Sequence, residues 1–312
     1  MNATSTPTAS ATPARPFGAA TIPVGWRRRA FPWRALRRNW LMTLSGGVLL
    51  LVVLSAALAP VIAPADPNLV SMRETLQGPS RAHLLGTDQL GRDHLSRLLH
   101  GGGKTLTMAG TAMLGTVGLG LLFGTLAGYL GGKTDLVISQ LLNVLLSLPS
   151  LLLALAILGV LGPGTTSLQL ALIASGWVGH ARIIRAAILG LREQPYIESA
   201  VSIGANPARV VVRHLLPNLV TTIAVLATLD LGVMLLTITS LSFLGLGVQP
   251  PTADWGTMLN DARSYVGQYP LLVFAPGICI SVVVLASNFL GDAIRDLVDI
   301  GRPGRQGKGS NA

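Results

Sequence analysis

Cysteine is nearly absent from this 312-residue chain: the single one, Cys279, lies within an apolar run. One thiol cannot form an intrachain disulfide, and a zinc cluster needs several ligands. The five histidines are His83, His94, His100, His180 and His214. They show no ligand spacing with cysteine or carboxylates, so each is expected to be solvated or interfacial. We therefore predict no metal site and no catalytic site.

Charged residues are also scarce, at 12% of the chain, whereas 50% of the residues are hydrophobic. This composition is typical of a membrane protein, whose main solvent is the bilayer. The formal net charge is +10, but Lys and Arg flank apolar runs and are not interleaved with aromatic residues. We therefore predict no nucleic-acid binding and attribute the charge to membrane orientation.

A phosphate-binding loop is missing as well. Gly103-Lys104-Thr105 is similar to the end of such a loop, but Leu98 occupies the position of its required first glycine. No strand is expected before it. The chain itself is therefore predicted not to bind ATP.

Long hydrophobic runs are abundant, and a transmembrane helix needs about 20 apolar residues. Four runs meet or approach that length, at residues 41–63, 105–130, 136–161 and 271–290. Pro149 is predicted to kink the third of these. Two further spans are expected at 167–182, which is short but can continue beyond the bilayer as a helix, and at 219–246. We predict an all-α membrane protein with six spans and both termini on one side.

The basic residues predict the orientation of these spans. All but six of the 23 Lys and Arg residues fall on the side of the termini. The six are Arg73, Arg81, Arg92, Arg97, Lys104 and Arg263. Because Lys and Arg are enriched in cytoplasmic loops, both termini and the 180–216 loop are predicted to be cytoplasmic. Residues 1–38, rich in Ala, Thr, Pro and Ser before a basic stretch, are predicted to form a disordered cytoplasmic tail, and 299–312 a second tail.

The 192–217 loop is predicted to contain two short helices. Pro195 fits the first turn of the first helix, and Gly204 can end it at positive φ. Pro217 is predicted to break the second helix where the next span begins. The alternative interpretation is an ordinary interfacial helix. Residues predicted to share one side of the first helix are Ile197, Ala200 and Val201.

Two strings are expected on the external side. In residues 84–98, Thr87 or Asp88 is predicted to cap an amphipathic helix whose Arg92 and Asp93 remain on the polar face. That helix either packs the spans or contacts substrate. In residues 240–256, glycines and a proline pair turn the chain, and Trp255 is predicted to anchor at the headgroup level.

Two features lie inside the spans. Gly120, Gly124 and Gly128 repeat every four residues and are predicted to let another helix approach, within the subunit or across a dimer. Asp230 is expected to face the bundle interior, a partner subunit or the translocation path, because a carboxylate facing lipid is costly. It either contacts the ammonium end of a substrate or packs by a hydrogen bond to Thr or Ser on another helix.

Residues 196–217 resemble the EAA loop of membrane subunits of bacterial ABC importers. In that family the first helix docks into a groove on the ATPase subunit and transmits nucleotide-driven motion. Two positions depart from the general pattern, with Ser199 in place of alanine and His214 in place of a common isoleucine. The resemblance assigns docking to Tyr196, Glu198, Ser199, Ala200, Gly204, Ala205, Leu216 and Pro217.

Both external strings, with Gly291-Asp292 and the residues that follow, resemble the C-type permease of dipeptide, oligopeptide and nickel importers. Family members often carry a glutamate where this chain has Ile238, so the role of that acid is not carried over. The matching positions are Gly86, Thr87, Asp88, Gly91, Arg92, Asp93, Ser96, Arg97, Leu241, Ser242, Phe243, Gly245, Gly247, Gly291 and Asp292.

The resemblance implies a type I ABC importer fold with a cytoplasmic coupling helix, in the cytoplasmic (inner) membrane. Residues 39–104 would form the first transmembrane helix and an external amphipathic segment. Residues 105–298 would form the permease transmembrane domain. The implied partners are a B-type permease in a heterodimer, two ATPase subunits that hold ATP and Mg²⁺, and an external solute-binding protein.

The implied function is uptake of short peptides by alternating access, with no enzymatic activity and no cofactor on this chain. Nickel or another small solute is the alternative cargo. A secondary transporter with Asp230 as its ion site, and more remotely a membrane-embedded enzyme, are alternatives from other classes.

Overall fold

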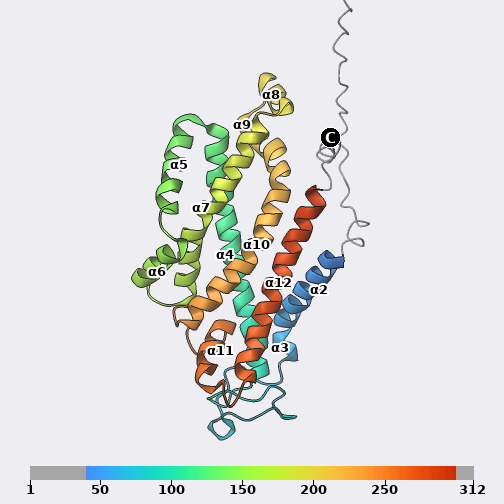
Figure 1. Cartoon of the computed structure of the whole chain (residues 1–312), viewed down its shortest axis with the longest axis vertical. Helices are drawn as coiled ribbons and strands as arrows, with labels where there is room; N and C mark the ends of the chain where they lie inside the picture. Colours follow the sequence, from blue (N-terminus) through green and yellow to red (C-terminus); the bar gives the residue numbers. More distant parts are fainter. Residues whose placement is uncertain (1–39, 300–312) are drawn as a thin grey trace, which may run out of the picture.

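The computed structural model describes residues 40–299, and this part of the chain is almost entirely helical (Figure 1). Five helical stretches are long and apolar enough to cross a membrane, and a bent helix pair makes a sixth if it counts as one span. The all-α prediction is confirmed. The two predicted tails lie outside the described residues, apart from Asp299. The five long helices are α2 (Trp40–Ala57), α4 (His94–Leu130), α7 (Thr165–Arg192), α10 (Leu216–Phe243) and α12 (Leu271–Asp299).

The third predicted span is not one continuous helix. It consists of α5 (Gly132–Leu146) and α6 (Ser150–Leu161), whose axes differ by 85°. The break falls at Ser147–Pro149 because proline disfavours helical backbone in the residue before it and fits the start of a new helix. Pro149 therefore separates two nearly perpendicular helices instead of kinking one helix.

Pro217, in contrast, does not end a helix. α9 (Pro207–Val210) continues through a π-helical turn, Val211–Leu215, directly into α10. In that turn the Leu216 N–H donates to the carbonyl of Val211, five residues earlier. A wider turn relieves the clash that a proline ring makes with the preceding helical turn. The prediction of a break was wrong, and residues 207–243 form one span-length helix.

The bundle is organised around α4 and α7, which pack along their lengths. A Cβ atom added to Gly124 would lie 2.7 Å from the carbonyl oxygen of Ala181, and one added to Gly128 would lie 2.9 Å from Ile188. A Cβ atom added to Gly120 would likewise collide with His180. The glycine repeat of α4 therefore faces α7 of the same chain, where it allows close backbone approach.

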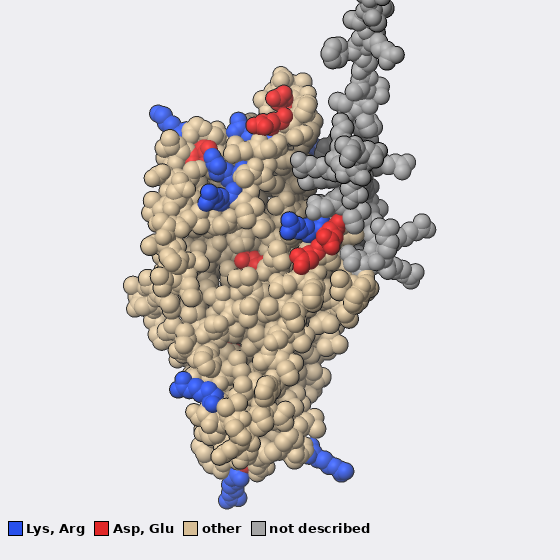
Figure 2. Space-filling view, viewed as in Figure 1, with Lys and Arg blue, Asp and Glu red and all other residues tan. Residues whose placement is uncertain are grey.

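The two ends of the bundle differ in structure. At one end, the α8 end, lie α8 (Pro195–Ser202) and α9; at the other, the α11 end, lie the 63–93 loop and α11 (Trp255–Ala262) (Figure 1). Short helices at the α11 end are α3 (Ala59–Ile62) and the 3₁₀ turns Met72–Glu74 and Arg263–Tyr265. Lys and Arg gather at the α8 end, a few lie at the α11 end, and the surface between is largely uncharged (Figure 2).

Candidate functional site

The α8 helix is held against the bundle by two side chains. Ile197 and Ala200 are 3% and 8% exposed, and Ile197 packs in a cluster with Ile188 of α7 and Leu215 and Leu219 at the start of α10. Pro195 occupies the first turn, as predicted. α8 is therefore joined to both α7 and α10 through apolar contacts.

The end of α8 is fixed by its backbone. Gly204 has φ +79°, which confirms the predicted positive φ. Its N–H donates to the Val201 carbonyl at 2.9 Å, and the Ala205 N–H donates to the Ala200 carbonyl at 3.1 Å. This pair of bonds is a Schellman motif. Asn206 then caps α9 by accepting from the Ala208 N–H at 2.9 Å.

The opposite face of α8 is exposed. Glu198 and Ser199 point away from the buried side, Val201 is 53% exposed and Ile203 is 86% exposed. Of the three residues predicted to share one side of this helix, Ile197 and Ala200 are buried and Val201 is not, so the buried stripe is limited to Ile197 and Ala200. We call this short capped helix the α8 knob. Its exposed tip carries one carboxylate, Glu198, and two aliphatic side chains, Val201 and Ile203.

The base of this knob is the π-helical turn. Asn218 donates from its side chain to the His214 carbonyl at 2.6 Å and to the Tyr196 hydroxyl at 3.4 Å. Burial raises the pKa of the Tyr196 phenol. Leu216 lines an apolar groove of about 500 Å³ between α4 and the α9–α10 helix. The eight residues assigned to docking thus form one continuous structure, α8 with its cap and its base.

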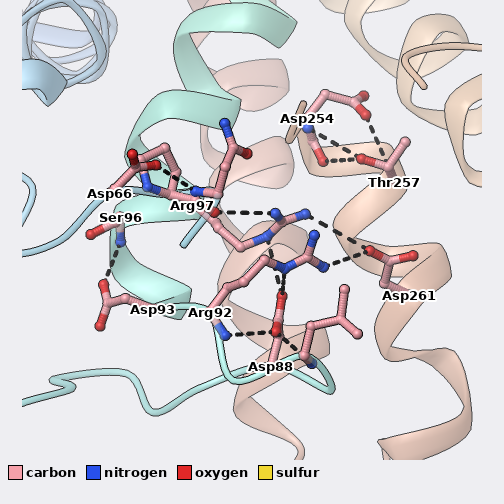
Figure 3. Close-up of polar contacts among 12 residues, drawn as sticks. Asp66, Asp88, Arg92, Asp93, Ser96, Arg97, Asp254, Thr257 and Asp261 are labelled. Carbon is pink, nitrogen blue, oxygen red and sulfur yellow. Dashed lines mark hydrogen bonds and ion pairs between the residues drawn. The ribbon is translucent and has the colours of Figure 1, made fainter. Parts of the chain in front are cut away.

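At the α11 end the string 84–98 folds into a buried ion-pair cluster (Figure 3). The Arg92 Nε atom donates to Asp88 at 2.7 Å, and the Arg97 Nε atom lies 3.3 Å from the same oxygen. Both guanidinium groups also face Asp261 of α11, at 3.5 and 3.8 Å. Arg92 and Arg97 are 4% and 3% exposed, so the prediction that Arg92 and Asp93 lie on a solvated polar face was wrong.

The cap of this string also differs from the prediction. Asp93, rather than Thr87 or Asp88, caps α4 by accepting from the Ser96 N–H at 2.8 Å. Asp88 instead accepts from the backbone of Leu90 and Arg92. The capped helix continues without interruption into the second span, so the predicted boundary between residues 104 and 105 falls inside α4.

Backbone turns complete the string. Gly86 and Gly91 have φ +79° and +70°, and a Cβ atom on either would collide with backbone of the 63–93 loop. Thr87 is 1% exposed; its hydroxyl accepts from the Gln77 N–H at 2.8 Å and donates to the Glu74 carbonyl. These residues therefore fold the loop onto itself.

The second string, 240–256, packs directly on the first. Trp255 is 2% exposed, its indole N–H donates to the Leu98 carbonyl at 3.0 Å, and its backbone N–H donates to the Thr105 hydroxyl at 3.1 Å. The prediction of a headgroup anchor was therefore wrong: Trp255 is buried between α4 and α11. Gly247 lies against Ser242, Gly245 has φ +82°, Leu241 and Ser242 are buried, and Phe243 is partly exposed.

Asp230 joins three helices. It accepts from the Thr116 hydroxyl of α4 at 3.0 Å, and its other oxygen lies 3.6 Å from His180 Nε2 of α7. The side chains of His180 and Asp230 are 12% and 11% exposed. This is the geometry that the packing alternative predicts. Among the described residues, no cluster of three or more His, Cys, Asp or Glu could hold a metal ion.

The remaining motif positions lie in or beside the core. Ile238 is fully buried among apolar side chains, and a Cβ atom on Gly291 would meet Leu229 of α10 at 2.9 Å. Asp292 is exposed. The expectation of solvated or interfacial histidines was wrong for His94, which is 2% exposed, and for His180, which lies inside the bundle beside Asp230. His83 is mostly buried, and its ring lies 2.9 Å from Asp93.

Asp261 and Gly102 were missed from the sequence. Asp261 follows the second string by five residues, and no local pattern pairs it with Arg92. Gly102 lies under the Trp255 ring, where a Cβ atom would come within 2.8 Å. The triple glycine at positions 101–103 was a signal of close packing.

Comparisons with known proteins agree with this architecture. Residues 120–300 match the model of the binding-protein-dependent transport system inner membrane component. Residues 26–79 match the N-terminal transmembrane domain of oligopeptide transport permease C. A chain of the inward-facing MetNI methionine ABC transporter has the same fold, with a TM-score of 0.51 and 20% identity over 65% of this chain and 97% of that one.

Among curated relatives, the nickel transport system permease protein NikC of Escherichia coli K12 is 37% identical, over 85% of this chain and 95% of its own length. The dipeptide permease DppC of Alkalihalophilus pseudofirmus is 38% identical, over 86% and 90%. The glutathione permease GsiD of Pectobacterium atrosepticum is 37% identical, over 88% and 97%. The chain therefore belongs to the family of binding-protein-dependent transport system inner membrane components, the multi-pass permease subunits of ABC importers.

Proposed function

We propose that this permease subunit imports short peptides and is driven through α8 by an ATPase subunit. The observation that carries the proposal is the capped knob at the α8 end. Ile197 packs it against α7 and the start of the α10 span, Ala200 is also buried, and Glu198, Val201 and Ile203 are presented outward. An exposed aliphatic tip on a rigid short helix fits a groove on another protein.

The orientation proposed for this end is cytoplasmic. Two of the six basic residues at the α11 end, Arg92 and Arg97, are neutralised by Asp88 and Asp261. The basic residues at the α8 end, such as Lys133 and Arg209, are mostly exposed. The excess of Lys and Arg at the α8 end supports its cytoplasmic placement. ATP hydrolysis on the cytoplasmic side would then reach α8, and external cargo would enter at the α11 end.

A second permease is part of the proposal. The apolar groove between α4 and α9–α10 is open, and large side chains on several long helices are exposed. A B-type permease would cover part of this surface in a heterodimer, with the translocation path between the two subunits. An external solute-binding protein would deliver the cargo.

The coupling assignment is tested by two variants. Glu198→Lys reverses the exposed charge of the knob, and Gly204→Val forces a β-branched residue to positive φ, at a cost of about 1–2 kcal/mol or more. Uptake by the reconstituted complex is expected to fall about tenfold or more, because like-charge contacts at an interface cost several kcal/mol. Membrane levels should stay normal and ATPase activity should continue. Normal coupled uptake in both variants would refute the assignment.

Peptide cargo is favoured by the dipeptide and glutathione relatives, and nickel by NikC. The described residues contain no metal-ligating cluster, so a nickel importer would have to select its cargo elsewhere. Calorimetry of the cognate binding protein with dipeptides and with Ni²⁺ separates the two. Binding of Ni²⁺ without binding of peptides would replace the peptide proposal.

A further inference from the structure

A polar pocket at the α11 end lies beside the ion-pair cluster. Its volume is about 180 Å³, room for several water molecules at about 30 Å³ each. We name it the Arg92–Arg97 pocket. Its polar walls include Arg92, Arg97, Ser242, Gln249, Asn260 and Asp261. It therefore joins the two family strings and α11.

The two guanidinium groups in this pocket keep unused donors. Each guanidinium carries five N–H donors. Arg92 donates through Nε to Asp88 at 2.7 Å, and Arg97 donates through Nη1 to the Pro67 carbonyl at 3.3 Å. Their Nη2 atoms lie 3.5 and 3.8 Å from Asp261, longer than a good hydrogen bond. Asp261 therefore leaves charged N–H donors of both arginines without a well-formed hydrogen bond in the pocket.

Ser242 adds a neutral donor. It is completely buried, and its hydroxyl has no hydrogen-bond partner among the residues that the structure describes. A buried hydroxyl without a partner is destabilising. Ser242 lines the pocket, so an acceptor bound there that reaches its hydroxyl would supply the missing partner.

The charge balance selects the ligand. Asp88 lies within ion-pair distance of both arginines and compensates one positive charge, which leaves the other to Asp261. Asp261 is the more accessible partner, since its side chain is 36% exposed whereas that of Asp88 is 7% exposed. A planar group with one negative charge and two acceptor oxygens matches guanidinium donors best.

We propose that the Arg92–Arg97 pocket binds a carboxylate presented at the α11 end. The carboxylate displaces Asp261 from the two guanidinium groups and accepts a hydrogen bond from Ser242. This proposal rests on the proposed function for its source, which is either the terminal carboxylate of a peptide cargo or an acidic side chain of the binding protein. The chemistry of the pocket is the same for both.

The first experiment uses the full complex in nanodiscs and titrates acetate at constant ionic strength, with thermal unfolding as the readout and acetamide as the neutral control. Acetate should stabilise the complex and acetamide should not. Ser242→Ala should weaken acetate binding about tenfold through loss of one hydrogen bond to a charged group. Asp261→Asn should tighten it about tenfold by removing the competing carboxylate.

Ser242→Ala avoids a folding artefact, because removal of an unpartnered hydroxyl costs the free protein no hydrogen bond. Ser240→Ala, an exposed serine on the same helix outside the pocket, is the matched control and should leave acetate binding unchanged. Absence of an acetate effect, or equal acetate affinity in Ser242→Ala and the native protein, would overturn the proposal.

The second experiment identifies the source by competition with acetate. A dipeptide that competes as the free acid but not as the C-terminal amide identifies the cargo. Competition by the binding protein without cargo identifies its side chain. Competition by neither overturns the proposal even if acetate binds. This result is separable from failure of the proposed function, which would appear as coupled uptake that is normal in both Glu198→Lys and Gly204→Val.

Discussion

Single residues set how closely the two family strings pack. Trp255 is held by its indole N–H on Leu98 and by its backbone on Thr105, so its ring cannot swing aside. Gly102 lies directly under that ring. A small residue is therefore required there by a side chain more than a hundred positions away in the sequence.

Gly102→Ala is expected to destabilise the protein by about 1–3 kcal/mol, the usual cost of overpacking. Its Cβ atom would come within 2.8 Å of the buried ring. The neighbouring Gly103→Ala is the control, since its Cβ atom would find nothing closer than 3.5 Å. Thermal unfolding in detergent measures both, and equal midpoints would contradict the packing argument.

Local chemistry at single residues could be predicted, and distant partnerships could not. The positive φ of Gly204 followed from glycine after a helical pattern, and Asn206-Pro207 marked the next start. The partners of Arg92 could not be found, because Asp261 approaches through tertiary folding. Burial of such charges is invisible to a local pattern that treats every arginine as solvated.

Helices show the same limit through two prolines. Pro149 separates α5 from α6 by 85°, whereas Pro217 is accommodated inside one continuous helix. The residue type alone does not decide between these outcomes. Leu215 and Leu219 are buried on either side of Pro217, so tertiary packing holds that helix together through its π-helical turn. Leu148 and Ser150, which flank Pro149, are both exposed.

The contact between α4 and α7 gives a prediction at this scale. Gly124→Ala places a Cβ atom 2.7 Å from the Ala181 carbonyl, and a backbone oxygen cannot rotate away. The two helices must separate, with an expected loss of about 1–3 kcal/mol. Gly118→Ala on the same helix has no atom within 4 Å of its added Cβ and should be neutral or slightly stabilising. Thermal unfolding measures both variants, and a Gly118 variant as unstable as the Gly124 variant would disprove the close packing of α4 on α7.

For the whole molecule, the proposed orientation predicts accessibility. In a Cys279→Ala background, Asn206→Cys near α9 should resist an impermeant maleimide in intact cells and react after permeabilisation. Gly78→Cys, at an exposed position of the 63–93 loop, should react in intact cells. The reverse pattern would invert the orientation and remove α8 from the side of ATP.

Two helical stretches run nearly the full length of the protein. α4 and the helix from Pro207 to Phe243 each contain 37 residues, about 55 Å at 1.5 Å per residue, against a hydrocarbon core of about 30 Å. The α4 helix is unbroken, the second stretch includes the π-helical turn, and in the proposed orientation both have their ends in different aqueous compartments. A rocking motion of about 5° around the middle of such a helix moves each tip by about 2 Å in opposite directions. That is on the scale of the 3.5 and 3.8 Å spacings to Asp261, so under the proposed coupling through α8 a tilt of this size would change the distances of the ion pairs at the α11 end.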